Sequence, residues 1–339
     1  MGTGAFLSTI KTRSVVASAL CAAAALAATS LAGGAARADE DGVSFWLPGL
    51  YSSLAAVPGE RGWSMTNIFI YESGSASATH GFPRGGKLAV GVDGTVFADF
   101  GGLTYAFAKP VLGGQFSLGM LALPGQAVGT ISGTLTGPGG ATVSGARTDT
   151  DTGFGDLYPT AALKWNKGVN NYMTYLTGNI PVGSYDPKRL ANLGLGHGSI
   201  DGGTGYTYLN PTTGHEFSIV GGLTYNFENT HTNYQNGIDY HIDWAASQFL
   251  SKQFFVGPVG YFYGQLSGDS GSGDKVGPFE SSTIGVGGQA GYIFPVNEQV
   301  QGFLGLKGYA DVATEDRLKG WSVWLTLNLS PAPPKKAVQ

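Results

Sequence analysis

The segment Trp321-Ser322-Val323-Trp324-Leu325-Thr326-Leu327-Asn328-Leu329-Ser330 decides the fold class. Its residues at odd positions are all Trp, Val or Leu, and the residues between them are polar apart from Trp324. Successive side chains of a β-strand point to opposite faces. The segment therefore predicts a strand with one apolar face and one mostly polar face.

The same period of two recurs upstream, in residues 157–165, 216–228, 238–244 and 284–294. One face of each run carries large apolar residues, and the other carries Ser, Thr, Asn, Gly or charged residues. A soluble β-sandwich would bury the apolar face in its core. A membrane barrel would turn that face to lipid and line its lumen with the polar face.

The connections between the runs separate these two alternatives, because they alternate in length. The long ones are residues 73–86, 136–153, 182–198, 228–237, 267–280 and 311–320. The short ones are residues 109–114, 166–170, 211–214, 251–252 and 295–298. Outer-membrane barrels have short periplasmic turns and longer external loops. We therefore predict an all-β fold, a transmembrane antiparallel up-and-down β-barrel of about 12 strands (roughly 12 to 14) over residues 64–330. The count is weakest over residues 87–135, where Gly101-Gly102 could form a bend or bulge.

Composition supports the barrel. Only 12% of the residues are charged, about half the usual share, and 56 are glycine. After the N-terminal region, no apolar run reaches the length of about 18 residues that a membrane helix needs. A secreted β-sandwich or β-helix remains the alternative fold.

The N-terminus predicts a cleaved signal peptide over residues 1–38. Lys11 and Arg13 precede the apolar run 15–28, and Ala36-Arg37-Ala38 favours cleavage before Asp39. Cleavage removes three of 19 basic residues and none of 23 acidic ones, which leaves a net charge of −7 (16 minus 23). That balance argues against a nucleic-acid partner. The single cysteine of the chain leaves with the signal peptide.

The sequence pattern of residues 39–63 is too irregular for a β-strand, and we predict that these residues form a periplasmic N-terminal segment. It carries five large apolar residues, Phe45, Trp46, Leu47, Tyr51 and Leu54. Such a segment either plugs the lumen and lines a path through it or is a disordered leader. The proline-rich tail, residues 331–339, is predicted to be disordered.

Two groups of residues are candidates for a ligand path. Phe45, Trp46 and Tyr51 would form a plug or gate. Tyr261, Tyr263 and Gln265 would form a wall on which an aromatic ligand stacks. An aromatic girdle at the membrane interface would have the same sequence pattern, so both interpretations of the second group stay open.

A polar lumen network is predicted from Asn226, Asn229, Asp239, His241 and Asp243. His241 between two acids is also the best candidate for a hydrolytic base, but no Gly-x-Ser-x-Gly motif accompanies it. The histidines have no metal-ligand spacing. The acidic runs 149–156 and 269–274 are interpreted as solvated loops rather than calcium sites. We therefore expect no catalytic residue, no metal and no cofactor.

Several stretches together resemble one family, the outer-membrane proteins linked to meta-pathway phenol degradation. They are Val57-Pro58-Gly59 with Gly62-Trp63, Gly153-Phe154-Gly155-Asp156-Leu157 through Leu163-Lys164-Trp165, Asn179-Ile180-Pro181-Val182-Gly183-Ser184-Tyr185-Asp186, Thr224-Tyr225-Asn226-Phe227-Glu228-Asn229 with Thr232-Asn233-Tyr234-Gln235-Asn236-Gly237, His241 and Asp243, and Gly260-Tyr261-Phe262-Tyr263-Gly264-Gln265 with Asp269-Ser270-Gly271. The run 224–243 is the most specific of them. One departure is that the final strand ends Leu329-Ser330 instead of on an aromatic residue that the barrel-assembly machinery reads.

The resemblance implies an outer-membrane channel, broadly similar to the long-chain fatty-acid channel, that admits small hydrophobic and aromatic compounds for catabolism. The expected partners are outer-membrane lipid and lipopolysaccharide, the hydrophobic compounds themselves and the barrel-assembly machinery. The oligomeric state is not predicted. Two other functions stay open, a lipid-modifying barrel enzyme and a structural or adhesive barrel without transport.

Overall fold

A computed structural model describes residues 44–81, 87–136, 138–274 and 280–334. The chain divides into two units, Met1–Ala36 and Arg37–Gln339. The first unit lies outside the described residues, and so does the whole predicted signal peptide, residues 1–38. Within the described ranges, no helix is long and apolar enough to cross a membrane.

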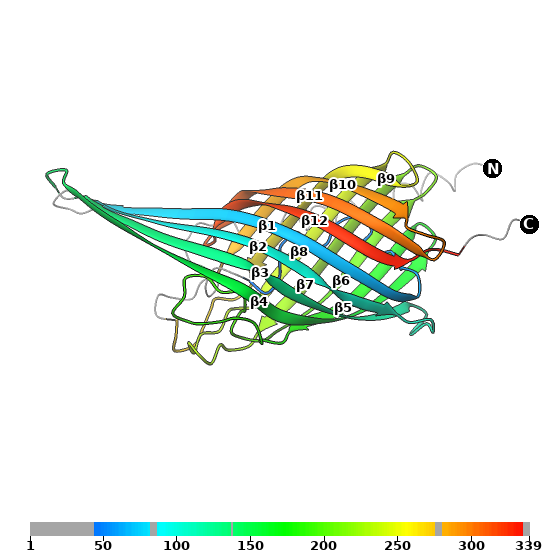
Figure 1. Cartoon of the computed structure of the whole chain (residues 1–339), viewed down its shortest axis with the longest axis horizontal. Helices are drawn as coiled ribbons and strands as arrows, with labels where there is room; N and C mark the ends of the chain where they lie inside the picture. Colours follow the sequence, from blue (N-terminus) through cyan, green and yellow to red (C-terminus); the bar gives the residue numbers. More distant parts are fainter. Residues whose placement is uncertain (1–43, 82–86, 137, 275–279, 335–339) are drawn as a thin grey trace, which may run out of the picture. The chain divides into compact units, whose positions relative to one another are not determined.

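The second unit is a closed antiparallel barrel (Figure 1). Its strands are β1 (Gly62–Gly81), β2 (Lys87–Ala106), β3 (Gln115–Thr136), β4 (Thr142–Lys167), β5 (Asn170–Asn179), β6 (Ser199–Asn210), β7 (His215–Asn226), β8 (Asp239–Phe249), β9 (Phe254–Gln265), β10 (Ser282–Pro295), β11 (Val300–Glu315) and β12 (Lys319–Pro331). Each strand pairs with its neighbours in sequence, and β12 pairs with β1 to close the ring. The predicted twelve-stranded barrel is confirmed.

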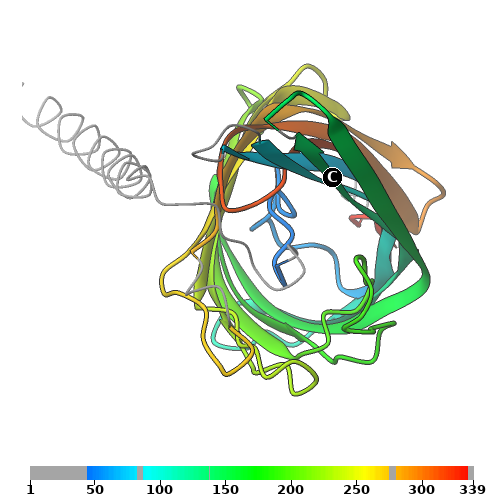
Figure 2. The ribbon, with the colours of Figure 1, turned by 90° about the vertical axis from the view of Figure 1, so that its left-hand side faces the viewer.

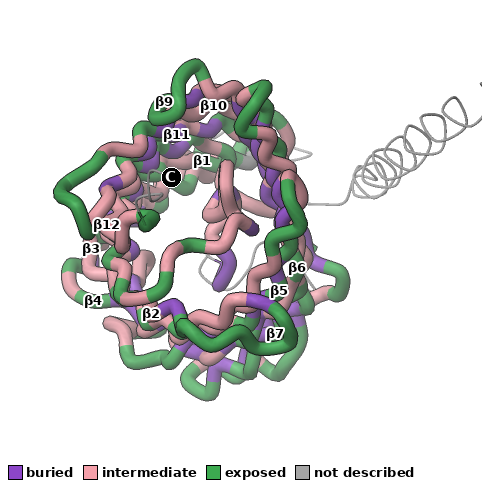
Figure 3. Tube along the Cα trace, turned by 90° about the vertical axis from the view of Figure 1, so that its right-hand side faces the viewer, coloured by how far each residue is buried: buried purple, intermediate pink, exposed green. Residues whose placement is uncertain are grey.

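The two faces of the strands match the sequence pattern. On β12, Trp321, Val323 and Leu325 lie on the outer face and are 40% to 50% exposed. Ser322 and Trp324, at the positions between them, are buried and therefore point inward. Figure 3 colours the strands of the barrel by burial. The exceptional Trp324 is therefore a lumen residue, and its ring lies 4.5 Å from the Nζ of Lys307. The cation–π contact explains why an indole occurs on the polar face.

Three predicted long loops are wrong, because strands replace most of them. β1 runs to Gly81, β4 already begins at Thr142, and only residues 316–318 separate β11 from β12. The predicted long connections 182–198, 228–237 and 267–280 are confirmed, with observed bounds of 180–198, 227–238 and 266–281. They lie at one end of the barrel, here called the long-loop end. β1 begins and β12 ends at the opposite, short-turn end.

The irregularity expected near Gly101-Gly102 occurs one strand further on. The register of β3 against β4 shifts between Ala122 and Pro124. Pairing of β2 with β3 stops at Ala98 and resumes at Gly101 without a change of register. Leu123 of β3 lies opposite two residues of β4, Gly155 and Asp156, so the extra residue of this bulge is on β4.

The outer face of β1 shows where an apolar belt ends. Trp63, Met65, Phe69 and Tyr71 are each at least 38% exposed, and Ser73, Ser75, Ser77 and Thr79 follow on the same face. Phe69 therefore lies within the lipid-facing belt and Ser75 beyond it.

This boundary makes a stability prediction. We expect Leu325→Arg, on the outer face of β12 between Phe69 of β1 and Leu306 of β11, to lower the free energy of unfolding by about 2–4 kcal/mol, because it places a charge in hydrocarbon. Ser75→Arg, on the outer face of β1 beyond the belt, should leave it unchanged. Urea unfolding of both variants in lipid vesicles measures the difference, and equal stabilities would contradict the position of the belt.

Candidate functional site

The barrel lumen is occupied by residues 44–61, here called the lumen segment. Figure 2, which looks into the ring of strands, shows this segment (blue) inside it. Phe45, Trp46 and Ala56 are 6%, 2% and 0% exposed and belong to the same core cluster as inward residues of the wall. The segment has no regular strand or helix, so its polar backbone groups need partners on the wall.

Asp243 on β8 and Lys307 on β11 supply one set of partners. The backbone N–H groups of Gly49 and Tyr51 donate to the Asp243 carboxylate at 2.8 and 3.0 Å. Lys307 donates to the carbonyls of Gly49 and Leu50 at 2.5 and 2.9 Å. A buried anion thus accepts from the turn at residues 49–51 while a buried cation donates to it, and both charges use hydrogen bonds to the segment.

A second set of partners holds residues 53–56. Glu216 on β7 accepts from the Ser53 hydroxyl at 2.5 Å and from the Leu54 N–H at 3.0 Å. The Ala56 N–H donates to Thr207 on β6 at 3.0 Å, and Lys164 on β4 donates to the Ala55 carbonyl at 2.7 Å. Together the two sets fix the lumen segment to β4, β6, β7, β8 and β11.

Gly49 is a position that only glycine fits. Its φ is +86°, and a Cβ there would lie 2.8 Å from the ring of Tyr309.

We expect Gly49→Ala to weaken docking of the lumen segment by at least about 1–2 kcal/mol, the cost of placing an L-residue in the left-handed conformation. Gly59→Ala is the matched control, because nothing lies within 4 Å of its Cβ position. Hydrogen exchange of residues 44–58 should be faster in Gly49→Ala only; equal protection in both variants would contradict the assignment.

Trp46 and His241 form the aromatic centre of the lumen. Their rings stack with centroids 3.5 Å apart and planes 13° apart. The Nε2 of His241 is 3.1 Å from both the Asp201 carboxylate and the Tyr175 hydroxyl. Burial, followed by the charges of Asp201 and Asp243, raises the pKa of Tyr51 above its ordinary value. The Tyr51 hydroxyl therefore stays neutral at physiological pH.

These contacts bear on the hydrolase hypothesis. Trp46 covers the His241 ring, and the hydrogen bonds of Nε2 go to a carboxylate and a phenol instead of a serine. No group of three or more His, Cys, Asp or Glu residues placed to hold a metal occurs among the described residues.

Tyr261 and Tyr263 point into the lumen, while Phe262 between them is on the outer face. Tyr261 packs against Tyr309 at 5.1 Å and donates to Asp311 at 2.5 Å. The Arg317 guanidinium lies 4.7 Å from the centroid of the Tyr263 ring. Both tyrosines thus lie near the lumen segment, because Gly49 and Ser44 contact Tyr309 and Arg317 respectively.

Gln265, Asn226, Asn229 and Asp239 lie elsewhere, at the long-loop end. Gln265 donates to Asp269 at 2.7 Å, and Asn226 donates to Asp239 at 2.9 Å. Asn229 donates to the Tyr185 hydroxyl at 2.7 Å. This group fastens the loops 227–238 and 266–281 to the ends of β7, β8 and β9. From the predicted polar network, His241 and Asp243 contact the lumen segment.

Asp156 is a structural residue that the sequence analysis assigned to a solvated loop, and that assignment is wrong. Asp156 is 0% exposed and accepts from Asn179, Gly183 and Leu195 at 2.6, 2.9 and 3.2 Å. Asp151 is also buried and pairs with Arg189 at 2.6 Å. Both carboxylates hold the loop 180–198 against β4. A Cβ on Gly183 would lie 2.5 Å from the backbone of Gly155, and a Cβ on Gly155 would lie 2.8 Å from the Leu193 carbonyl oxygen. Both glycines of the quoted motifs therefore let the loop lie close to β4.

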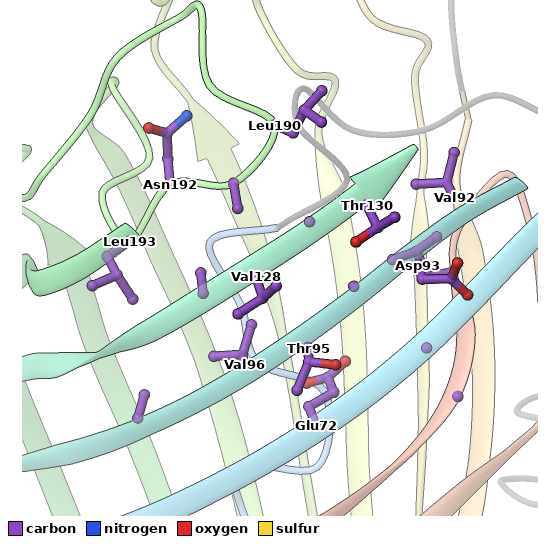
Figure 4. A pocket seen from close by; sticks show the side chains of 18 of the residues that line it. Glu72, Val92, Asp93, Thr95, Val96, Val128, Thr130, Leu190, Asn192 and Leu193 are labelled. Carbon is purple, nitrogen blue, oxygen red and sulfur yellow. The ribbon is translucent and has the colours of Figure 1, made fainter. Parts of the chain in front are cut away.

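A cavity of about 240 Å³ lies on the wall formed by β1, β2 and β3 (Figure 4). The lumen segment contributes Leu47 and Pro48 to its lining, and two connections contribute residues 190–195 and 317–318. Most of its side chains are aliphatic, including Ile70, Val92, Val96, Val128, Ile131, Leu123, Leu190, Leu193, Leu195 and Leu318. Charged groups are limited to Glu72, Asp93 and Arg317. No local sequence pattern predicts this cavity, because its lining comes from four distant parts of the chain.

A closed antiparallel barrel with an apolar outer belt and a polar lumen is an integral outer-membrane β-barrel. In this one, the N-terminal segment of the chain occupies the lumen. The family described as "Putative MetA-pathway of phenol degradation" matches residues 78–327, and the chain belongs to this family. The resemblance found in the sequence is therefore confirmed.

A solved structure shares the fold. An outer membrane channel from Pseudomonas putida F1 is 15% identical, with a TM-score of 0.51, over 80% of this chain and 97% of that one. The transport unit of the autotransporter AIDA-I from Escherichia coli (12% identity, TM-score 0.35, 81% and 91% covered) is more distant. So is a FadL homologue from Pseudomonas aeruginosa (8% identity, TM-score 0.32, 79% and 88% covered). None of the curated proteins compared with the chain matches it.

Proposed function

We propose that this protein is an outer-membrane channel for passive uptake of small hydrophobic, in particular aromatic, compounds that feed catabolism. The observation that carries the proposal is the aliphatic cavity between the wall of β1 to β3 and the segment that occupies the lumen. A water-filled pore would need an open, polar passage, whereas this lumen holds Phe45 and Trp46 at its core. Membership in a family linked to phenol degradation supports the aromatic class.

The proposed mechanism is a series of weak apolar sites. Lipopolysaccharide resists apolar solutes, and a polar pore offers them no affinity. Contact with successive aliphatic and aromatic side chains provides about 1 kcal/mol at each site, enough to enter and weak enough to leave. In this mechanism the solute enters at the long-loop end, which faces outward by the barrel rule. It occupies the cavity and passes when the lumen segment moves.

Transport in this proposal is downhill and involves no chemistry on the solute. His241 serves as a partner of Trp46 and Asp201, which supports a structural role over that of a hydrolytic base. A hydrolase activity that disappears in His241→Ala would instead favour the lipid-modifying enzyme.

Uptake by whole cells tests the proposal, because their lipopolysaccharide provides the barrier. Cells with and without the protein receive micromolar radiolabelled toluene, and glycerol serves as a polar control solute. We expect faster toluene uptake in cells with the protein and equal glycerol uptake in both. Equal toluene rates, with the protein correctly assembled in the outer membrane, would overturn the proposal.

A further inference from the structure

β1 to β4 run on past the ends of the other strands at the long-loop end (Figure 1). They have 20, 20, 22 and 26 residues, against 10 to 16 in the remaining strands. The part beyond the apolar belt is here called the extension. It comprises residues 73–81, 87–95, 128–136 and 142–150, which pair with one another in continuous register.

The polarity of the sheet inverts at the start of the extension. The outer face is mostly apolar up to Tyr71 on β1, Phe97 on β2 and Phe154 on β4. Its polar exception on β1 and β2 is the pair of Asn67 and Asp99, in which Asn67 donates to Asp99 at 2.6 Å. Beyond these positions the same face is mostly Ser and Thr, namely Ser73, Ser75, Ser77, Thr79, Thr95, Thr130, Ser132, Thr134, Thr136, Thr142, Ser144, Thr148 and Thr150. A hydroxyl-covered outer face suits the sugar region outside the hydrocarbon. The polar outer face of the extension is therefore explained by its surroundings and does not indicate a ligand site.

The opposite face of the extension continues the lumen face and is apolar. Leu88 pairs with Leu135 and Val92 with Ile131, and Val143 lies next to Leu135 on β4. These five side chains are 37% to 75% exposed. Glycine occupies five further positions on this face, Gly74, Gly94, Gly129, Gly133 and Gly145, and these positions leave room for a molecule lying on the strip. Its charged pair, Arg147 and Asp149, is at the β4 edge.

The apolar strip leads directly into the cavity. Val92 and Ile131 belong to the strip and also line the cavity. Next to them on the same face, a Cβ on Gly94 would lie 2.8 Å from Leu318. The turn 316–318 therefore covers the strip where the cavity begins. This turn covers the strip at the end next to the cavity. At the end farther from the membrane, the described residues leave the strip uncovered.

We propose that the lumen-side face of the extension captures uncharged aromatic or aliphatic compounds outside the membrane and delivers them to the cavity. This inference rests on the proposed function and adds an entry route to it. The occupant is a small uncharged molecule, because the strip is aliphatic and the cavity that it enters is small. An apolar cavity of about 150 Å³ already accommodates benzene. The strip is continuous with the cavity, and a small solute can use this continuity. A lipid acyl chain or a second protein would cover the strip without entering the cavity, so neither explains why the two are continuous.

Two neighbouring substitutions on β3 test this route. Leu135→Asp puts a charge on the apolar strip, and Thr134→Asp puts the same charge on the hydroxyl face. Both lie beyond the belt, so both variants should assemble. In the uptake assay, we expect Leu135→Asp to slow toluene uptake several-fold at limiting concentration with the same rate at saturation, and Thr134→Asp to match the wild type. Wild-type rates in both variants would overturn the inference and leave the proposed function intact.

Photolabelling gives a readout that does not depend on transport. The wild-type protein in outer-membrane fragments is irradiated with a small aryl diazirine, and labelled peptides are identified by mass spectrometry. We expect labels on residues 88–92 and 131–135 that excess toluene removes, and fewer labels there in Leu135→Asp. Labelling that toluene leaves unchanged would mean that lipid or protein covers the strip, and it would overturn the inference. If competed labelling occurs but cells take up no toluene, the proposed function fails instead.

Discussion

Deletion of residues 45–58 should turn the barrel into a water-filled pore. The deletion removes Phe45 and Trp46 from the lumen and exposes Asp243, Glu216 and Lys307 to water. Barrels of 8 strands are filled by side chains, and those of 16 to 18 strands leave aqueous channels. A twelve-stranded barrel without its lumen segment should therefore conduct ions. In planar bilayers we expect single-channel conductance to rise by roughly an order of magnitude or more over the wild type.

The deletion should also change what the cell admits. Glycerol and small antibiotics should enter cells carrying the deletion faster than cells with the wild-type protein. A folded barrel, verified by its heat-modifiable migration on gels, is the control for assembly. A deletion variant that folds and remains non-conducting would contradict the assignment of residues 44–61 as the obstruction.

The second large effect is expected from Asp243→Ala. Asp243 accepts from the N–H groups of Gly49 and Tyr51. Loss of the carboxylate leaves two buried donors without an acceptor, at a cost of about 1–3 kcal/mol each. A free-energy change of 1.4 kcal/mol changes an equilibrium constant tenfold, so the undocked population of the lumen segment should rise roughly 30-fold or more. The measurement is the frequency of channel openings together with hydrogen exchange of residues 44–58.

Asp239→Ala is the matched control for that substitution. Asp239 lies four residues earlier on β8 with the same inward orientation, and it accepts from Asn226 at the long-loop end. Its loss should loosen the loop 227–238 without releasing the lumen segment. Equal opening frequencies in Asp243→Ala and Asp239→Ala would show that the segment is not held by Asp243.

The alternation of side chains was enough to predict the barrel, but it was not enough to place all of the strand ends. In residues 142–153, Thr, Asp and Gly replace the large apolar residues of a lipid-facing strand, so the segment resembles a loop. The same composition suits a strand that has left the membrane, because sugar and water replace hydrocarbon around it. A rule built on apolar-out, polar-in alternation therefore ends each strand at the belt, although β4 runs on.

Residues of the candidate site could be predicted where the position of a residue along a strand fixes the direction of its side chain. Asp243 and His241 alternate with Ile242 and Trp244, so their inward orientation follows from the pattern. Glu216, Lys164 and Lys307 alternate in the same way, yet their role depends on which part of residues 44–61 lies against them. Asp156 and Asp269 bind loops whose paths are set by tertiary packing, so no local pattern distinguishes them from solvated acids.

The central claim, that compounds cross only when the lumen segment moves, can be tested with one disulfide. The hydroxyls of Ser53 and Ser247 are 2.7 Å apart, and the only cysteine of the chain, Cys21, is within the predicted signal peptide. In the double variant Ser53→Cys/Ser247→Cys, oxidation should tie the segment to β8. Toluene uptake by intact cells is then measured before and after reduction, with the two single variants as controls. We expect uptake to stop in the oxidised double variant and to return on reduction; uptake that continues with the disulfide formed would contradict the account.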